Sequence, residues 1–324
     1  MTTPLTSVII AAKNAEQTIG SSLKSLTMQG FTPDELEVLV VNDGSDDHSA
    51  EVIAEYEDKL NMVTIENPTS LGVSASRNLA LEASTGQTIT YLDGDDWYAP
   101  GHLRKMTDAI TGLGVDFVKI DYVLVEGTKR SLNQAPCALR NRPLNPRDYI
   151  MPANMPTMVD YPACWTGIFT RSMADRGLLT FDPALRTCED RPWTWRQHLE
   201  SDSFAVINSA GLCYRKGMST SLTSIYDERQ LDFIPAFRTV FAMLESDPEI
   251  DEFETKAVRN FLSILYHQLV KRSDQMTAEV KQKLFAGATT NVKMIKPELV
   301  DRVVEKFGDD RVPVIAPVLR RAQA

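Results

Sequence analysis

The sequence predicts an α/β fold built on a mainly parallel sheet, followed by a helical C-terminal region. Through the first hundred residues, short apolar and β-branched runs alternate with longer segments whose apolar residues recur at helical spacing. This alternation is typical of a doubly wound parallel sheet with helices on both faces. From about residue 225 the strand-like runs stop, and only amphipathic helical stripes remain.

The first hundred residues contain four expected strands and three expected helices. Each strand is a short apolar run, and the fourth is also rich in β-branched and aromatic residues. The expected strands are residues 7–11, 37–41, 61–66 and 87–92. The expected helices are residues 15–26, 49–60 and 72–83.

Beyond residue 100 the alternation loosens. Residues 115–125 are expected to form a further strand. Residues 136–162 contain six prolines, and such a long irregular stretch is more often a binding loop than a spacer. In the C-terminal region two helical faces are apolar, and they are expected to pack as a cap or an oligomer surface. These faces comprise Leu231, Ile234, Phe237, Phe241 and Leu244, and then Val258, Leu262, Leu265 and Leu269.

Composition excludes several classes of protein. The chain has 324 residues, 43% of them hydrophobic and 24% charged, which is ordinary for a soluble globular protein. A net charge of -10 argues against general nucleic-acid binding. The four cysteines have no C-x-x-C spacing, so reduced thiols are expected rather than disulfides or a zinc site. No signal peptide or membrane-length apolar run is visible, and a cytoplasmic location is expected.

The main functional signal lies at the end of the fourth expected strand, where an apolar run ends in Asp93-Gly94-Asp95-Asp96. Open α/β sheets bind ligands at the carboxyl ends of their strands. Carboxylates this close repel one another unless a cation joins them, and oxygen ligands suit Mg²⁺ or Mn²⁺. On these residues alone, an acidic loop that only caps the next helix is the alternative.

Two further polar loops follow expected strands, at Lys13-Asn14 and at residues 42–47. Because the carboxyl ends of parallel strands meet at one edge of the sheet, these loops and the acidic loop are expected to converge on one crevice. The helix expected from residue 72 adds Arg77 and Asn78 one turn in. None of the loops has the G-x-G-x-x-G motif of dinucleotide-binding proteins or the Walker motif of P-loop proteins, so the sequence predicts neither class.

These pieces occur in the order and spacing of family 2 glycosyltransferases, which the chain resembles over residues 5–222. The resemblance implies a GT-A fold with a catalytic domain over residues 1–224. Within the domain it implies a nucleotide-sugar-binding half over residues 1–100 and an acceptor half over residues 101–224. The helical region over residues 225–324, expected from its apolar spacing, lies outside the resemblance. The matching runs are Ser7-Val8-Ile9-Ile10-Ala11-Ala12-Lys13-Asn14, Val40-Val41-Asn42-Asp43-Gly44-Ser45-Asp46-Asp47, Gly72-Val73-Ser74-Ala75-Ser76-Arg77-Asn78 and Tyr91-Leu92-Asp93-Gly94-Asp95-Asp96.

On the donor side, the resemblance implies that Asp43 meets the nucleotide base, an interaction that an Asx turn at the same residue does not exclude. Arg77 would face the diphosphate; a surface ion pair is the alternative. Asp95 would contact a Mn²⁺ or Mg²⁺ ion directly, Asp93 would be shared between ribose and metal, and Asp96 would cap the next helix. The full donor set is Ala11, Lys13, Asn14, Asp43, Arg77, Asp93, Gly94, Asp95, Arg215, Ser219 and Ser221.

A second acidic site follows about a hundred residues later. The resemblance implies that Asp190 is the general base that takes the proton from the acceptor hydroxyl, with Glu189 as a supporting or acceptor-binding acid. The alternative is a simple helix N-terminal charge. Trp165, Trp193 and Trp195 are candidate sugar platforms, although such aromatics are more often core residues. Arg215 and Lys216 would meet the donor phosphates in a mobile loop that includes Ser219 and Ser221; a solvated loop without that role is the alternative.

The chain departs from the family at Ala12-Lys13, where an aromatic residue usually lies against the base. UDP is still the expected nucleotide. The implied reaction is inverting transfer of a sugar from a UDP-sugar to a hydroxyl of a cell-surface glycan or glycolipid precursor. Peripheral membrane contact and a homo-oligomer formed through the C-terminal helices are compatible with it.

Two other functions have distinguishing signatures. A nucleotidyltransferase would carry an early glycine-rich basic loop, and residues 11–20 are not one. An inactive nucleotide- or sugar-binding module would have lost Asp95 or the Glu189-Asp190 pair, and both are present.

Overall fold

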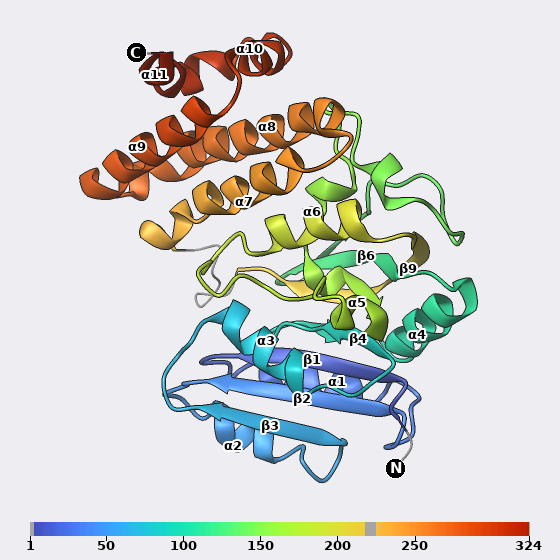
Figure 1. The fold of residues 1–324 in the computed structure, drawn as a ribbon. Coiled ribbons are helices and arrows are strands. Elements are labelled where there is room, and N and C mark those ends of the chain that lie inside the picture. The colour runs from blue at the N-terminus through green and yellow to red at the C-terminus, as the bar shows by residue number, and fades with distance from the viewer. Residues whose placement is uncertain (1–2, 218–224, 324) are drawn as a thin grey trace. The chain divides into compact units, whose positions relative to one another are not determined.

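The computed structural model describes residues 3–217 and 225–323, which form two compact units (Figure 1). The sheet unit comprises Met1–Pro146, Ala163–Ala184 and Leu199–Ser221; the helical unit comprises Arg147–Pro162, Leu185–His198 and Leu222–Ala324. A domain boundary at residue 225 remains a proposal. Two segments that precede this boundary, residues 147–162 and 185–198, also belong to the helical unit.

The sheet has nine strands in the described part of the chain, in the order β3-β2-β1-β4-β8-β6-β9-β5, with β7 paired to β6. The first four strands in sequence are parallel to one another, and the antiparallel strand β8 joins them to the parallel pair β6 and β9. The prediction of a mainly parallel sheet is therefore confirmed. The strands are β1 (Thr6–Ala12), β2 (Leu36–Asp43), β3 (Met62–Asn67), β4 (Thr88–Tyr91), β5 (Trp97–Tyr98), β6 (Phe117–Glu126), β7 (Lys129–Asn133), β8 (Gly167–Thr170) and β9 (Phe204–Arg215).

Helices cover the sheet, which explains why its central strands are almost wholly buried. Every residue of β2 is buried, as expected of a strand covered on both faces. The helix α3 packs on β1 and β2, whereas α4 packs on β6, β8 and β9. The helices of this unit are α1 (Ile19–Leu26), α2 (Ser49–Ala54), α3 (Val73–Ala83), α4 (His102–Leu113) and α5 (Arg171–Asp175).

Two of the expected helices are shorter than the apolar spacing indicates. The first begins at Ile19, and upstream of it the backbone N–H groups of Ala15 and Glu16 bond to side chains at the start of α2 and in the loop before α2. The second ends at Ala54, after which the backbone continues in turns. In those turns the N–H of Tyr56 bonds to the carbonyl of Ile53, three residues back, which is tighter than α-helical spacing.

The helical unit is built on an aromatic core. The Phe233 ring packs on Phe261 with centroids 5.7 Å apart, and Phe237 packs on the same ring at 5.8 Å. Most of the two predicted apolar faces are buried, including Ile234, Leu244 and Leu265. The helices are α6 (Asp190–Glu200), of which residues 190–198 belong to this unit, α7 (Phe233–Glu245), α8 (Ile250–His267), α9 (Ala278–Met294), α10 (Pro297–Glu305) and α11 (Val312–Gln323).

Part of the proline-rich stretch is anchored inside the helical unit. The buried Lys256 of α8 donates to the carboxylate of Asp160 at 2.5 Å and to the carbonyl of Met155 at 2.8 Å. Arg147 pairs with Asp247 and Glu249. These ion pairs hold residues 147–160 against the helices. Among the described residues, no helix is both long enough and apolar enough to span a membrane.

Candidate active site

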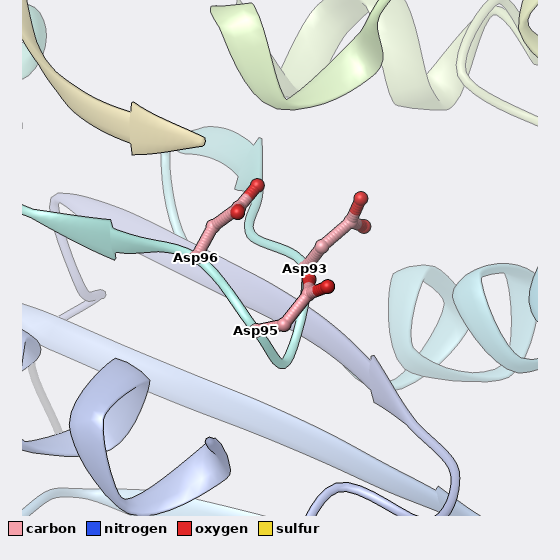
Figure 2. Close-up of side chains that lie close together, drawn as sticks. All are labelled: Asp93, Asp95 and Asp96. Atoms are coloured by element: carbon pink, nitrogen blue, oxygen red, sulfur yellow. The ribbon is translucent and has the colours of Figure 1, made fainter. Parts of the chain in front are cut away.

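The acidic loop that follows β4 brings three carboxylates together. One oxygen from each of Asp93, Asp95 and Asp96 lies within 4.8 Å of the others, and Figure 2 shows all three on one short turn. Asp96 is fully buried; its Oδ1 accepts the backbone N–H of Arg215 at 2.8 Å, while its Oδ2 has no hydrogen-bond partner. The predicted metal ligands were Asp93 and Asp95 alone, and the structure adds Asp96 to them as a third nearby carboxylate.

The predicted role of Asp96 as a helix cap is wrong. The acidic loop leads into strand β5, and the next helix, α4, begins only at His102. The carboxylate of Asp96 instead bonds to the end of β9. This partner lies 119 residues away in the chain, so a local pattern could not reveal it.

Burial and mutual repulsion make three charges unfavourable in this loop. Burial, and then the charge of Asp93, raise the pKa of Asp95 to about 6. Burial, followed by the charges of Asp93 and Asp95, raises the pKa of Asp96 well above its ordinary value. A divalent cation would relieve this repulsion, and the unpartnered oxygen of Asp96 offers it a further hard ligand. The residues therefore fit Mg²⁺ or Mn²⁺.

Two arginines flank the acidic loop. Arg77 of α3 is buried, donates to Asp93 Oδ1 at 2.9 Å and lies over the Phe181 ring at 5.2 Å. Arg215 donates through Nε to the carbonyl of Asp95 at 2.9 Å and lies over the Trp97 ring at 4.7 Å. The ion pair of Arg77 is thus partly buried, with the Arg77 side chain 6% exposed and that of Asp93 31% exposed. Two guanidinium groups beside a candidate cation site suit an anionic ligand such as a diphosphate.

Asp43, at the end of β2, is buried and accepts four hydrogen bonds of 2.7–2.9 Å from the segment that leads into α3. Burial alone would raise the pKa of Asp43, but these donors lower it to about 2. The donors are Asn67 Nδ2, Ser70 Oγ and the N–H groups of Leu71 and Gly72. The predicted contact of Asp43 with a base stays a prediction, and its bonds to this segment were not anticipated.

The loops after β1 and β2 are joined by reciprocal hydrogen bonds. The N–H of Asn14 donates to Ser45 Oγ at 2.9 Å, and Asn14 Oδ1 accepts the N–H of Asp46 at 3.0 Å. Asn14 adopts a left-handed φ of 50° to do so. Ala11 is half-buried and Lys13 exposed, and Gly94 of the acidic loop lies next to Ala12. The three polar loops therefore share one edge of the sheet, as predicted.

The second acidic pair belongs to the helical unit, whereas the acidic loop belongs to the sheet unit. Asp190 is the first residue of α6, and both Glu189 and Asp190 are half-buried. Cys188, just before them, has a left-handed φ of 57°. Which role Glu189 and Asp190 take stays a prediction.

The tryptophans fall into two groups. Trp165 is 9% exposed and stacks on Tyr214 with centroids 4.9 Å apart and an interplanar angle of 10°. Trp193 and Trp195, in contrast, are 1% and 0% exposed. These two are core residues in the structure, so they have no surface to offer a sugar and the prediction of platforms is corrected. Ser219 and Ser221 lie outside the described residues.

The comparisons with known proteins agree with this geometry. Residues 7–177 match the model of the family described as glycosyl transferase family 2. EpsH of Bacillus subtilis, a glycosyltransferase by name, is 26% identical over 88% of this chain and 81% of its own length. The poly(ribitol-phosphate) β-N-acetylglucosaminyltransferase TarS of Staphylococcus aureus is 26% identical over 92% of this chain. The chain spans only 51% of TarS.

Solved structures show the same fold. A crystal structure of residues 1–349 of TarS in complex with UDP-GlcNAc superimposes with a TM-score of 0.76 at 21% identity, covering 98% of this chain and 89% of that one. A mannosyltransferase from Pyrobaculum calidifontis in complex with GDP-Man and Mn²⁺ gives a TM-score of 0.51 at 14% identity, covering 100% of this chain and 88% of that one. The predicted GT-A fold is thereby confirmed.

Proposed function

The chain belongs to glycosyl transferase family 2, and from that premise we propose that it transfers a sugar, with inversion, from a UDP-sugar to a hydroxyl of a cell-envelope glycan. The observation that carries the proposal is the cluster of Asp93, Asp95 and Asp96 flanked by Arg77 and Arg215. A cation and two guanidinium groups at one place suit a nucleoside diphosphate leaving group.

In this proposal Asp93, Asp95 and Asp96 hold Mn²⁺ or Mg²⁺. When bound, the ion supplies positive charge for the diphosphate as the sugar departs. Arg77 and Arg215 orient that diphosphate, and their ring contacts with Phe181 and Trp97 limit the freedom of both side chains. The two hydrogen bonds between Asn14 and residues 45–46 fix the loops after β1 and β2 before the donor binds.

The chemical step is a single displacement. Asp190 takes the proton from the acceptor hydroxyl as its oxygen attacks the anomeric carbon. A new carbon–oxygen bond forms on one face of the sugar while the bond to the diphosphate breaks on the other, so the configuration inverts and UDP leaves. Glu189 supports Asp190 or binds the acceptor.

The relatives support a UDP-sugar and a cell-envelope glycan. TarS is named for transfer of N-acetylglucosamine to poly(ribitol phosphate), and its solved structure holds UDP-GlcNAc. A further relative, ExoU of Rhizobium meliloti, is named for succinoglycan biosynthesis and is 34% identical over 38% of this chain. Because the mannosyltransferase of the same fold holds GDP-Man, the base must be tested directly.

Calorimetric titration of UDP, GDP and CDP, each with and without Mn²⁺, tests the donor site. We expect UDP to bind most tightly and Mn²⁺ to strengthen its binding. Asp95→Ala should abolish the effect of Mn²⁺, while Asp58→Ala, a change in a turn beyond α2, is the matched control. Absence of binding by all three nucleotides would contradict the proposal, and tighter binding of GDP or CDP would reassign the base.

A further inference from the structure

We propose that Asp232 is a positioning residue that fixes the segment carrying Glu189 and Asp190, so that the C-terminal helices take part in catalysis. Asp232 lies between the short 3₁₀ helix η5 (Glu228–Leu231) and α7. The inference rests on the proposed function, because it gives Asp232 a role through the general base Asp190.

Asp232 accepts hydrogen bonds from the backbone just before Glu189 and Asp190. Its Oδ2 accepts the backbone N–H of Arg186 at 2.6 Å and that of Thr187 at 3.1 Å. The hydroxyl of Thr187, which is buried, donates to the carbonyl of Arg229 at 2.5 Å. Two adjacent residues of the segment are therefore held by three hydrogen bonds from one turn, and two of these end on a carboxylate oxygen, the stronger kind of acceptor.

The segment needs such an external hold. Residues 182–189 form turns and bends rather than a helix or strand, so they lack a regular ladder of backbone bonds. Cys188 has a left-handed φ of 57°, a conformation that persists in a non-glycine residue only when its surroundings fix it. Asp190 follows two residues later as the start of α6. The direction of its side chain therefore depends on how residues 186–188 are held.

The 3₁₀ helix η5, which precedes Asp232, is itself bonded to the C-terminal helices. Gln230 of η5 accepts a hydrogen bond at its Oε1 from Arg272 at 2.6 Å and one at its carbonyl from Gln268 at 3.3 Å. Both donors lie in the wider π-helical turn Gln268–Arg272 that continues α8. Lys283 of α9 pairs with Glu228 at 2.5 Å. A continuous set of contacts thus runs from α8 and α9 through η5 to Thr187, all inside the helical unit.

Alanine and asparagine substitutions separate positioning from simple loss of charge. Asp232→Ala removes the oxygen that accepts the two backbone N–H groups. We expect UDP release from UDP-GlcNAc with Mn²⁺, measured as hydrolysis in which water receives the sugar, to slow by about 30- to 100-fold, the scale of a misplaced catalytic group. The Kd for UDP should change less than about twofold, because the donor residues are not touched. Asp232→Asn keeps an oxygen that can accept both N–H groups and should stay within about threefold of the unaltered protein. Asp251→Ala, in the exposed first turn of α8, is the matched control.

A double variant distinguishes action through Asp190 from a general structural effect. If Asp232 acts through the base, Asp190→Asn combined with Asp232→Ala should be no slower than Asp190→Asn alone. Hydrogen–deuterium exchange of the peptide that contains residues 186–187 should accelerate in Asp232→Ala but not in Asp232→Asn. Additive losses of rate, or unchanged exchange, would overturn the inference.

The inference and the proposed function fail in different ways. If the Asp190→Asn protein releases UDP at the unaltered rate, Asp190 is not the base, and both the proposed role of Asp190 and this inference are wrong. If Asp190→Asn is slow while Asp232→Ala turns over normally, only the inference about Asp232 is wrong.

Discussion

Asp43 ends β2 and Asp95 lies in the loop after β4, on strands that flank β1, yet their surroundings shift the pKa values of the two aspartates in opposite directions. Asp43 is met by four hydrogen-bond donors, and its pKa falls to about 2. Asp95 is met by burial and by the charge of Asp93, and its pKa rises to about 6. At the residue scale, this difference separates a carboxylate already satisfied by the chain from one suited to an added cation.

The raised pKa of Asp95 predicts a pH-dependent affinity for metal. Below pH 6 a proton occupies Asp95 and competes with the cation, so Mn²⁺ affinity should fall by about tenfold for each pH unit. Calorimetry between pH 5 and 8 measures this fall, and Asp95→Asn should give weak binding with a shallower dependence on pH. A flat profile for the unaltered protein would mean that Asp95 is not a ligand.

The stability of the metal-free protein depends on pH in the opposite direction to its metal affinity. The pKa of Asp95 in the folded protein lies above its ordinary value of 3.8, so the folded state binds more protons than the unfolded chain at intermediate pH. The contribution of Asp95 to stability is therefore greatest below about pH 4 and decreases as the pH rises to about 6. Added Mn²⁺ should remove this decrease.

Asp190→Asn tests the proposed base. Asparagine keeps the size of the side chain but cannot accept the proton, so transfer should slow by about two orders of magnitude or more. The Kd for UDP should be unchanged. Rates of UDP release and calorimetric titration measure the two effects, and Asp251→Asn is the control. An unchanged rate would exclude Asp190 from the mechanism.

Gly44 is a residue at which only glycine fits. Its φ is 64°, and a Cβ there would lie 2.7 Å from the backbone nitrogen of Ser70, closer than van der Waals contact allows. Gly44→Ala should destabilise the protein by about 2 kcal/mol or more, since strain and a steric clash combine. Chemical denaturation measures the loss. Gly30→Ala is the control, because its φ of 76° is also left-handed but its Cβ would meet nothing within 4 Å.

At the element scale, the segment between β3 and α3 is held by a side chain from β2 rather than by its own regular structure. Asp43 bonds to four groups between Asn67 and Gly72, and Gly72 directly precedes α3. The position of Arg77, one turn into α3, therefore depends on Asp43. In the same way η5 holds the segment before α6 through Asp232.

Asp43→Asn should loosen this segment. An amide has one acceptor oxygen, so part of the donor set would face an NH₂ group, at a cost of about 1–3 kcal/mol. Equilibrium denaturation should show that loss, and UDP affinity should fall with it because Arg77 is no longer fixed. In the unaltered protein the stabilisation by Asp43 should disappear as the pH falls from about 4 to about 2. Full stability of Asp43→Asn would contradict this account.

At the scale of the whole molecule, the candidate residues are divided between two units that each have their own core. The acidic loop, Arg77 and Arg215 belong to the sheet unit, whereas Glu189, Asp190 and Asp232 belong to the helical unit. If the sheet unit alone binds the donor, UDP with Mn²⁺ at about a hundred times its Kd should stabilise that unit by about 2.7 kcal/mol. Differential scanning calorimetry of the full chain should show a higher melting transition, and Asp95→Ala should show no shift.

Local sequence pattern determined the elements and the family. The strands β1 to β4 and the helix α3 follow from apolar spacing, because burial on a sheet or helix face repeats every few residues. The acidic loop was found because its carboxylates are adjacent in sequence, and the glycosyltransferase motifs were found for the same reason. The start of α1 and the end of α2 were missed. The segment before α1 bonds to side chains of residues 47–49, whereas α2 gives way to tighter turns of its own backbone, and apolar spacing reveals neither.

The tertiary structure alone decided which distant groups meet. Asp96 bonds to Arg215 across 119 residues, and Asp232 bonds to Thr187 across 45. Trp193 was a candidate for sugar binding by type, but its burial in α6 shows it to be a core residue. These pairings depend on the path of the whole chain, and hydrophobic burial, the main force that sets this path, is non-directional. Periodicity therefore predicts that a face is buried, whereas only the assembled fold shows what lies against it.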